Sequence, residues 1–111
     1  MAGTHNLQID QGSDFTLDLT VNEDGSAKNL TGYSARAQMR STKTASAVSA
    51  SFTCTVVNAS AGTIKMQLSN TTSSALAAGQ YFYDLEIFTG GDAIVQRLIE
   101  GTVTLNQEVT R

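Results

Sequence analysis

Apolar and polar residues alternate along several segments of this chain, and this alternation limits the possible folds more than any other feature. A period of two is typical of a β-strand with one face on a core and the other in water. The clearest case runs from Phe15 to Val21, where Thr16, Asp18 and Thr20 separate the apolar residues. The same period returns at Tyr33, Ala35, Ala37 and Met39, at Phe52, Cys54 and Val56, and at Ile64, Met66 and Leu68. The pattern predicts an all-β fold.

Turn signals separate these segments. They are NEDGS (22–26), LTG (30–32), NASAG (58–62) and TGGD (89–92). Short strands at this spacing favour a sandwich or a barrel. We interpret Gly90 and Gly91 as part of a hairpin turn, because the chain has no phosphate-binding glycine motif around them.

Three segments fit the alternation less well. The small residues of 42–51 predict an exposed connection. In segment 69–79, Asn70 or Thr71 is expected to cap one short helical turn, Leu76 to point inward, and Gly79 to end the turn. Near the C-terminus, Gly101 is expected to mark a bulge or a bend, after which Val103 and Leu105 face inward again.

Length and composition exclude several classes of protein. The 111 residues predict one domain, 1–111. A net charge of -3 without a basic cluster argues against nucleic-acid binding. The apolar runs are too short to span a bilayer, and the N-terminus lacks the pattern of a signal peptide, so we expect no membrane insertion and synthesis in the cytoplasm.

We expect no catalytic, cofactor or metal site. The single histidine, His5, has no nucleophile at a suitable spacing, and Cys54 stands on an apolar strand face, where a thiol is unreactive. The acidic residues between Asp10 and Asp24 do not form a calcium-binding loop, so we interpret them as solvated carboxylates.

The segment GQYFYDLEIF (79–88) is open to two interpretations. Asp84 and Glu86 lie two residues apart, as a glycosidase pair can, but a strand's solvent face gives the two carboxylates no difference in environment. As a strand, the segment turns its tyrosines inward and places Phe82 and Phe88 on the outer face. Two aromatic residues on an outer face favour contact with another protein or a covering loop.

The order of several motifs resembles a family of small β-domain proteins of tailed bacteriophages, and is similar to the N-terminal domain of phage upper baseplate proteins. The most specific motifs are LTGY, G-x-Y-x-YD and the ending L-x-EG-x-V-x-x-x-x-EVTR. The family often has a proline before EVTR, where this chain has NQEVTR. The matching segments are QGSDF (11–15), NLTGYSARAQMR (29–40), GTIKMQLSNTTSSALAAGQYFYDLEI (62–87) and VQRLIEGTVTLNQEVTR (95–111).

The resemblance implies an immunoglobulin-like antiparallel β-sandwich that serves as a building block of the virion. From the resemblance and the alternation of residues together, we expect about seven strands and one short helical turn. The residues expected in the core are Phe15, Leu17, Leu19, Tyr33, Met39, Phe52, Cys54, Val56, Ile64, Met66, Leu68, Leu76, Tyr81, Tyr83, Leu85 and Val103.

The function that follows is a non-enzymatic subunit of the tail, baseplate or neck. It assembles in multiple copies through contacts with other virion proteins and with copies of itself. The candidate interface residues are Phe82, Phe88, Ile94 and Val95. Three alternatives stay open: a head decoration protein, a small glycan-binding module that uses Tyr33, Tyr81 or Tyr83 as a platform, and an enzyme that uses Asp84 and Glu86.

Overall fold

β-strands dominate the computed structural model, which describes residues 3–23 and 25–109. Strands make up 57% of the chain and helices 8%, so the prediction of an all-β fold is confirmed. The elements are β1 (Gly3–Thr4), β2 (Leu7–Asp10), β3 (Phe15–Thr20), β4 (Asn22–Glu23), β5 (Ser26–Ala27), β6 (Ser34–Arg40), β7 (Ala50–Asn58), β8 (Thr63–Leu68), α1 (Asn70–Ala75), β9 (Gly79–Phe88), the 3-10 turn η1 (Gly90–Asp92) and β10 (Val95–Asn106).

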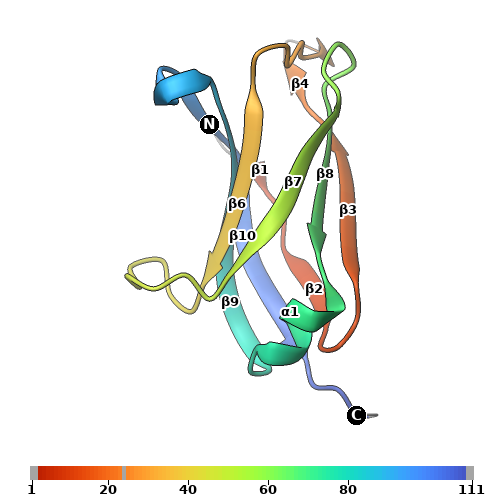
Figure 1. Cartoon of the computed structure of the whole chain (residues 1–111), viewed down its shortest axis with the longest axis vertical. Helices are drawn as coiled ribbons and strands as arrows, with labels where there is room; N and C mark the ends of the chain where they lie inside the picture. The colour runs from red at the N-terminus through yellow and green to blue at the C-terminus, as the bar shows by residue number, and fades with distance from the viewer. Residues whose placement is uncertain (1–2, 24, 110–111) are drawn as a thin grey trace.

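The main sheet curls over on itself, and β7 makes the connection between its two halves (Figure 1). Its strand order is β1-β10-β9-β6-β7-β8-β3, and β2 also pairs with β10. The first residues of β7, 50–52, pair with residues 37–39 of β6, whereas residues 53–56 and 58 pair with β8, with a register shift at Val57. One strand therefore belongs to both halves.

The expected fully antiparallel arrangement is wrong, because the sheet is mixed. β1 and β2 run parallel to β10, with Gly3 opposite Ile99 and Leu7 opposite Val103. The alternation of residues states which side chains share a face, but it carries no information about a strand's neighbour or direction. The immunoglobulin-like arrangement stays a prediction.

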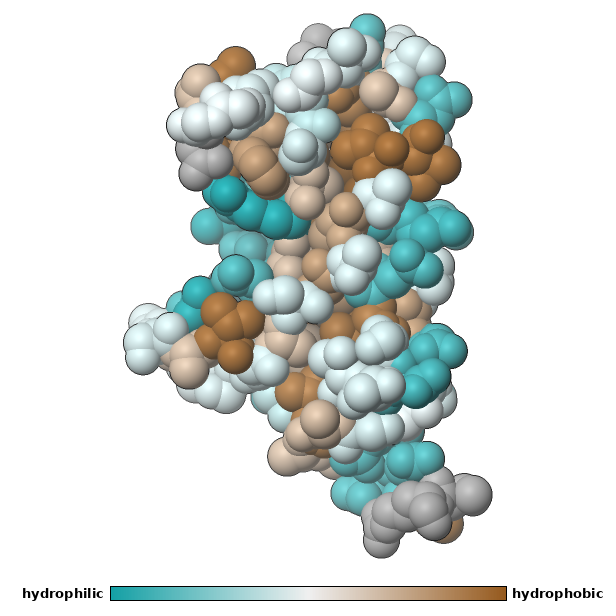
Figure 2. All heavy atoms as spheres, in the orientation of Figure 1, coloured by the Kyte–Doolittle hydropathy of each residue, from teal (hydrophilic) through white to brown (hydrophobic). Residues whose placement is uncertain are grey.

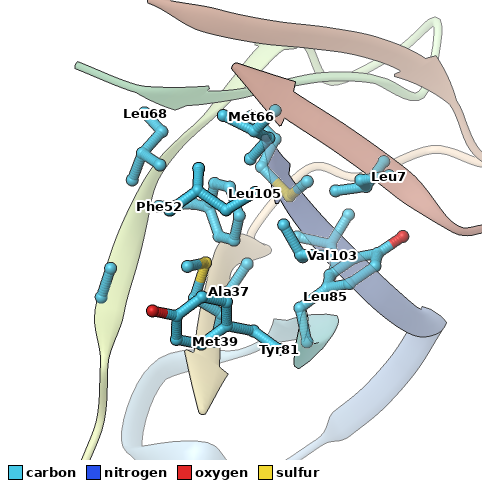
Figure 3. Packing of buried hydrophobic residues seen from close by; sticks show 13 residues of the cluster. Leu7, Ala37, Met39, Phe52, Met66, Leu68, Tyr81, Leu85, Val103 and Leu105 are labelled. Atoms are coloured by element: carbon cyan, nitrogen blue, oxygen red, sulfur yellow. The ribbon is translucent and has the colours of Figure 1, made fainter. Parts of the chain in front are cut away.

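The core lies between the two halves of the sheet (Figure 3). Nine residues expected there are buried: Met39, Phe52, Ile64, Met66, Leu68, Tyr81, Tyr83, Leu85 and Val103. The other seven are half-buried and pack against the core: Phe15, Leu17, Leu19, Tyr33, Cys54, Val56 and Leu76. Four buried residues were not expected in the core: Leu7, Ile9, Leu30 and Ala50.

The short helix α1 forms where a helical turn was expected, but its ends differ from the prediction. Ser69 is the N-cap, and its hydroxyl accepts a hydrogen bond from the Thr72 amide at 3.3 Å. The helix ends before Leu76, whose backbone is extended, so Gly79 does not end it. The fully buried Ser73 hydroxyl accepts from the Gly12 amide and donates to the Ser13 carbonyl, which joins α1 to the turn between β2 and β3.

Gly101 is not the bulge that we expected. The irregular position in the pairing of β9 and β10 lies between Arg97 and Ile99. At Gly101 the backbone carbonyl of His5 comes so close that a Cβ atom would collide with it. The glycine therefore allows the N-terminal segment to lie against β10. The prediction of a turn at Gly90 and Gly91 is confirmed.

The connection between β6 and β7 lacks regular structure over residues 41–49 and is largely exposed, as expected. Ala50 and Ser51, which the prediction included in this connection, instead begin β7.

Candidate functional site

The outer face of β9 holds two of the four candidate interface residues. Tyr81, Tyr83, Leu85 and Ile87 are buried, and the residues between them are half-buried, so the predicted alternation of this strand is confirmed. The half-buried residues are Phe82, Asp84, Glu86 and Phe88. β6 and β10 flank β9 and provide the neighbours of these side chains.

Both carboxylates on this face form ion pairs with arginines of the neighbouring strands. Glu86 Oε1 lies 2.5 Å from Arg36 Nε on β6, and Asp84 Oδ2 lies 3.3 Å from Arg97 Nε on β10. Glu100 joins the second pair, 3.8 Å from Arg97 and 3.8 Å from Lys43. This face is therefore a network of partly exposed, mutually compensated charges.

The surroundings of Asp84 and Glu86 give no support to the enzyme hypothesis. General acid catalysis at such a pair needs one carboxyl in an apolar pocket while its partner stays ionised. Here each carboxylate contacts a guanidinium group and is in part open to solvent. The two environments are similar, so nothing in the geometry assigns the residues different roles.

Phe88 is partly covered by its own chain. The Arg36 guanidinium lies over the ring, 4.3 Å from its centroid, in a cation–π contact. Arg36 thus contacts both Glu86 and Phe88. This contact gives Phe88 a partner within its own chain, so an aromatic residue on the outer face does not by itself require a partner protein.

Ile94 and Val95 lie at the turn between β9 and β10 and are 52% and 45% exposed. Two hydrogen bonds between Thr89 and Ile94 hold the turn. Phe88 is the strand partner of Val95, so three of the four candidates lie together. We call Phe88, Ile94 and Val95 the turn patch.

Phe82 is separate from the turn patch. It lies six residues from Phe88 on the same strand, which corresponds to about 20 Å. Its neighbours are Arg40 on β6 and Thr102 on β10. A depression of about 340 Å³ opens beside it, and its lining is Gln38, Arg40, Lys43, Phe82, Tyr83, Asp84, Glu86, Arg97 and Glu100.

The hypothesis of a tyrosine platform for glycans is wrong for two of its three residues. Tyr81 and Tyr83 are buried, and their hydroxyls donate to the backbone carbonyls of Ala77 at 2.6 Å and His5 at 2.5 Å. Burial raises the pKa of Tyr83 to about 12. Tyr33 is half-buried, with Lys28 Nζ 5.5 Å from its ring centroid.

Neither His5 nor Cys54 has surroundings that would support a catalytic role. The role of His5 in the structure comes from its backbone carbonyl, which accepts from Tyr83. Cys54 is half-buried, and burial raises the pKa of its thiol to about 11, as its place on an apolar strand face predicts.

Within residues 3–23 and 25–109, no three His, Cys, Asp or Glu side chains gather in a way that would hold a metal ion. The helices of the same described ranges include none long and apolar enough to cross a membrane.

The sequence interpretation missed one exposed apolar residue on a strand. Val57 on β7 is 59% exposed. The signal for it was present, because Val56 and Val57 interrupt the alternation of FTCTVV and two neighbouring strand residues cannot both face the core.

Comparisons with known proteins give a fold likeness. No protein-family model matches the chain, and no curated protein matches it. The N-terminal domain of phage TP901-1 ORF48 is similar with a TM-score of 0.57 at 14% identity, over 94% of this chain and 85% of that one. InlP of Listeria monocytogenes has a TM-score of 0.51 at 19% identity, over 95% of this chain and 28% of that one.

Proposed function

We propose that this chain is a non-enzymatic structural component of a tailed-phage particle, folded as one immunoglobulin-like domain over residues 1–111. It binds other virion proteins and further copies of itself. The observation that carries the proposal is the fold likeness to the ORF48 domain, a part of a baseplate protein, because the likeness extends over nearly the whole of both chains.

The motif resemblance supports the same proposal independently of the fold. LTGY, G-x-Y-x-YD and the C-terminal EVTR occur in the order found in small phage β-domains. A fold alone does not imply a function, since one scaffold carries many. The joint occurrence of the fold and the motif order is therefore what favours a virion component.

The turn patch is the side-chain surface that we propose for contact with another virion protein. Ile94 and Val95 are large, apolar and about half exposed, and such residues at the centre of an interface contribute most when a partner excludes water from them. Phe88 extends the patch, although Arg36 covers part of its ring. We place Phe82 outside the patch because of its distance along β9.

The first experiment asks whether the chain is part of the particle. Particles of a phage that encodes it are purified through two density gradients, and the chain is quantified by mass spectrometry against a capsid protein. We expect a fixed ratio of several copies per particle. A chain that stays in the lysate and is absent from purified particles would contradict the proposal.

The second experiment tests the turn patch by substituting its residues in the phage and measuring incorporation of each variant into particles. We expect the double variant Ile94→Ser and Val95→Ser to fold normally and to lower incorporation into particles at least about tenfold, since each truncated apolar side chain removes roughly 1 kcal/mol or more of interface burial. Val48→Ser is the matched control, because Val48 is 39% exposed on the distant connection between β6 and β7. Equal incorporation of all variants would remove the turn patch from the interface.

A further inference from the structure

One strand changes neighbours partway along its length and leaves part of its backbone without a partner. Residues 50–52 of β7 pair with β6, and the pairing with β8 begins at the next residue, Thr53. Beyond this point β6 and β7 diverge, as Figure 1 shows. Residues 53–56 then pair with β8 on one side, a register shift follows at Val57, and no strand of the described chain pairs with residues 53–57 on the other side. We call this the free edge of β7.

The side chains of the free edge are apolar or uncharged and in part open to solvent. Cys54 and Val56 face inward but are only half-buried, and Val57 is 59% exposed. Thr53 and Thr55 are exposed on the outer face. In Figure 2 apolar surface follows the centre of this view, over the region where β6 and β7 separate, with hydrophilic surface on both sides.

The free edge of β7 differs from the other incompletely paired edges in its charge. Asp18 stands in the middle of β3, Asp10 ends β2, Arg36 lies on the diverging part of β6, and Arg97 lies on β10 before β1 begins. β7 carries no charged residue and no proline over its nine residues. Charged side chains and prolines are the usual protection of a strand edge against another strand. These four edges have a charged residue and the free edge of β7 does not; β1, which also lies at an edge, has only two residues, and a very short edge strand is itself protected.

We propose that the free edge of β7 pairs with the same edge of a second copy, antiparallel and around a twofold axis at Thr55. This contact deepens the part of the proposed function in which the chain binds further copies of itself, and it rests on that part. An antiparallel pairing centred at Thr55 places Thr55 opposite its own symmetry mate and Cys54 opposite Val56, and the register shift at Val57 ends the regular part of this pairing. β-branched and threonine pairs across strands are favourable, and no like charges meet.

Among the strand edges compared above, the free edge of β7 is the most suitable for pairing with a second copy. A twofold contact uses the same surface on both partners, so both unpaired edges are satisfied at once and the assembly closes as a dimer. If β3 were the edge in contact, its Asp18 would lie near a second Asp18 across the axis. The free edge of β7 is therefore the self-complementary one.

The main test introduces one charge at the proposed axis. Thr55→Glu places a carboxylate opposite Lys65 within the same copy, which favours the fold, while it brings two carboxylates together across the axis. By sedimentation velocity we expect the natural chain to form dimers and Thr55→Glu to weaken the dimer at least about tenfold. Mixing Thr55→Glu with Thr55→Lys should restore association, because the charges at the axis are then opposite.

Thr16→Glu is the matched control, since Thr16 is an exposed threonine on the β3 edge that also pairs with β8. It should dimerise as the natural chain does. A second readout uses Thr55→Cys in a Cys54→Ala background. Opposed residues of an antiparallel pair lie about 4.5 to 5.5 Å apart between Cα atoms, within the range of a disulfide, so mild oxidation should link two copies.

Three results would overturn the proposal. The first is a natural chain that stays monomeric up to about 1 mM, a concentration at which even a weak contact is populated. The second is a Thr55→Glu variant that is folded by circular dichroism and dimerises undiminished. The third is equal disulfide formation at Thr55→Cys and Thr16→Cys. None of these results bears on whether the chain is a virion component, which incorporation into particles decides separately.

Discussion

β9 and β7 are two long strands with similar alternation but different burial. On β9 the four inward residues are between 0% and 9% exposed. On β7 burial is complete only at the start, with Ala50 and Phe52 below 9%, and declines to half-buried Cys54 and Val56. β9 has a strand on each side over most of its length, whereas β7 pairs with β6 over residues 50–52 and with β8 only from Thr53 onward.

The difference shows that neighbours, more than residue type, determine how much an inward side chain is buried. Leu85 on β9 and Val56 on β7 both face the core, but only Leu85 is fully enclosed. Where the sheet divides at β7, the same pattern of residues leaves a partly open surface. Stability and reactivity should therefore differ between the two strands in measurable ways.

The largest expected effect is a difference in the cost of truncation. Leu85→Ala should lower the free energy of unfolding by about 3 kcal/mol, because it leaves a cavity in a closed part of the core. Val56→Ala should cost about 1 kcal/mol, because solvent already reaches part of the site. Urea unfolding followed by circular dichroism measures both values. Equal losses for the two variants would show that β7 is as enclosed as β9.

A smaller effect concerns the dependence of stability on pH. The Cys54 thiol has its pKa raised from 9.0 to about 11 in the folded chain. Below pH 9 the thiol is protonated in both the folded and the unfolded chain, so its contribution is constant. Between pH 9 and 11 the unfolded chain ionises and the folded chain does not, so stability falls as pH rises. We expect a loss of about 1 kcal/mol, since the site is partly open to solvent.

Cys54→Ala should remove this part of the pH dependence, as urea unfolding at pH 8.5 and at pH 10.5 would show. Tyr83 on β9 has its pKa raised from 10.0 to about 12, so its contribution falls in a higher window that the variant retains. If the free energy of unfolding falls by the same amount between the two pH values in the natural chain and in Cys54→Ala, the pKa of Cys54 is not raised by folding, and the prediction is wrong.

The smallest effect is expected on the outer face of β9. Glu86→Gln removes the charge that pairs with Arg36, and the free energy of unfolding should fall by less than about 1 kcal/mol, because the pair is partly exposed. The loss should shrink further in 1 M salt, which screens surface charges. A large loss that persists at high salt would mean that Arg36 depends on Glu86 for its place over Phe88.

The alternation of residues was sufficient to predict β3, β6, β8 and β9 and the faces of their side chains. It was sufficient because a strand's two faces differ only by parity in the sequence. The N-terminal LQID, which forms β2, was too short to be recognised, although its Leu7 and Ile9 are both buried against β10. Two apolar residues in four do not distinguish a strand from a polar loop.

The candidate interface was predicted in part. Ile94 and Val95 are exposed, but the sequence could not show that Arg36, 52 residues before Phe88, lies on its ring. Nor did it show the free edge of β7, because a strand's sequence does not state where its neighbour departs. Both features depend on contacts between segments far apart in the chain.

The sequence by itself determined the class of fold, the inward faces of the main strands and the place of the turns, since these follow from local backbone geometry and side-chain polarity. Only the tertiary structure decided the parallel pairing of the N-terminal strands with β10, the passage of β7 between the two halves of the sheet, and the close approach of His5 to Gly101. Such long-range contacts are set by the packing of the whole core, which no local pattern encodes.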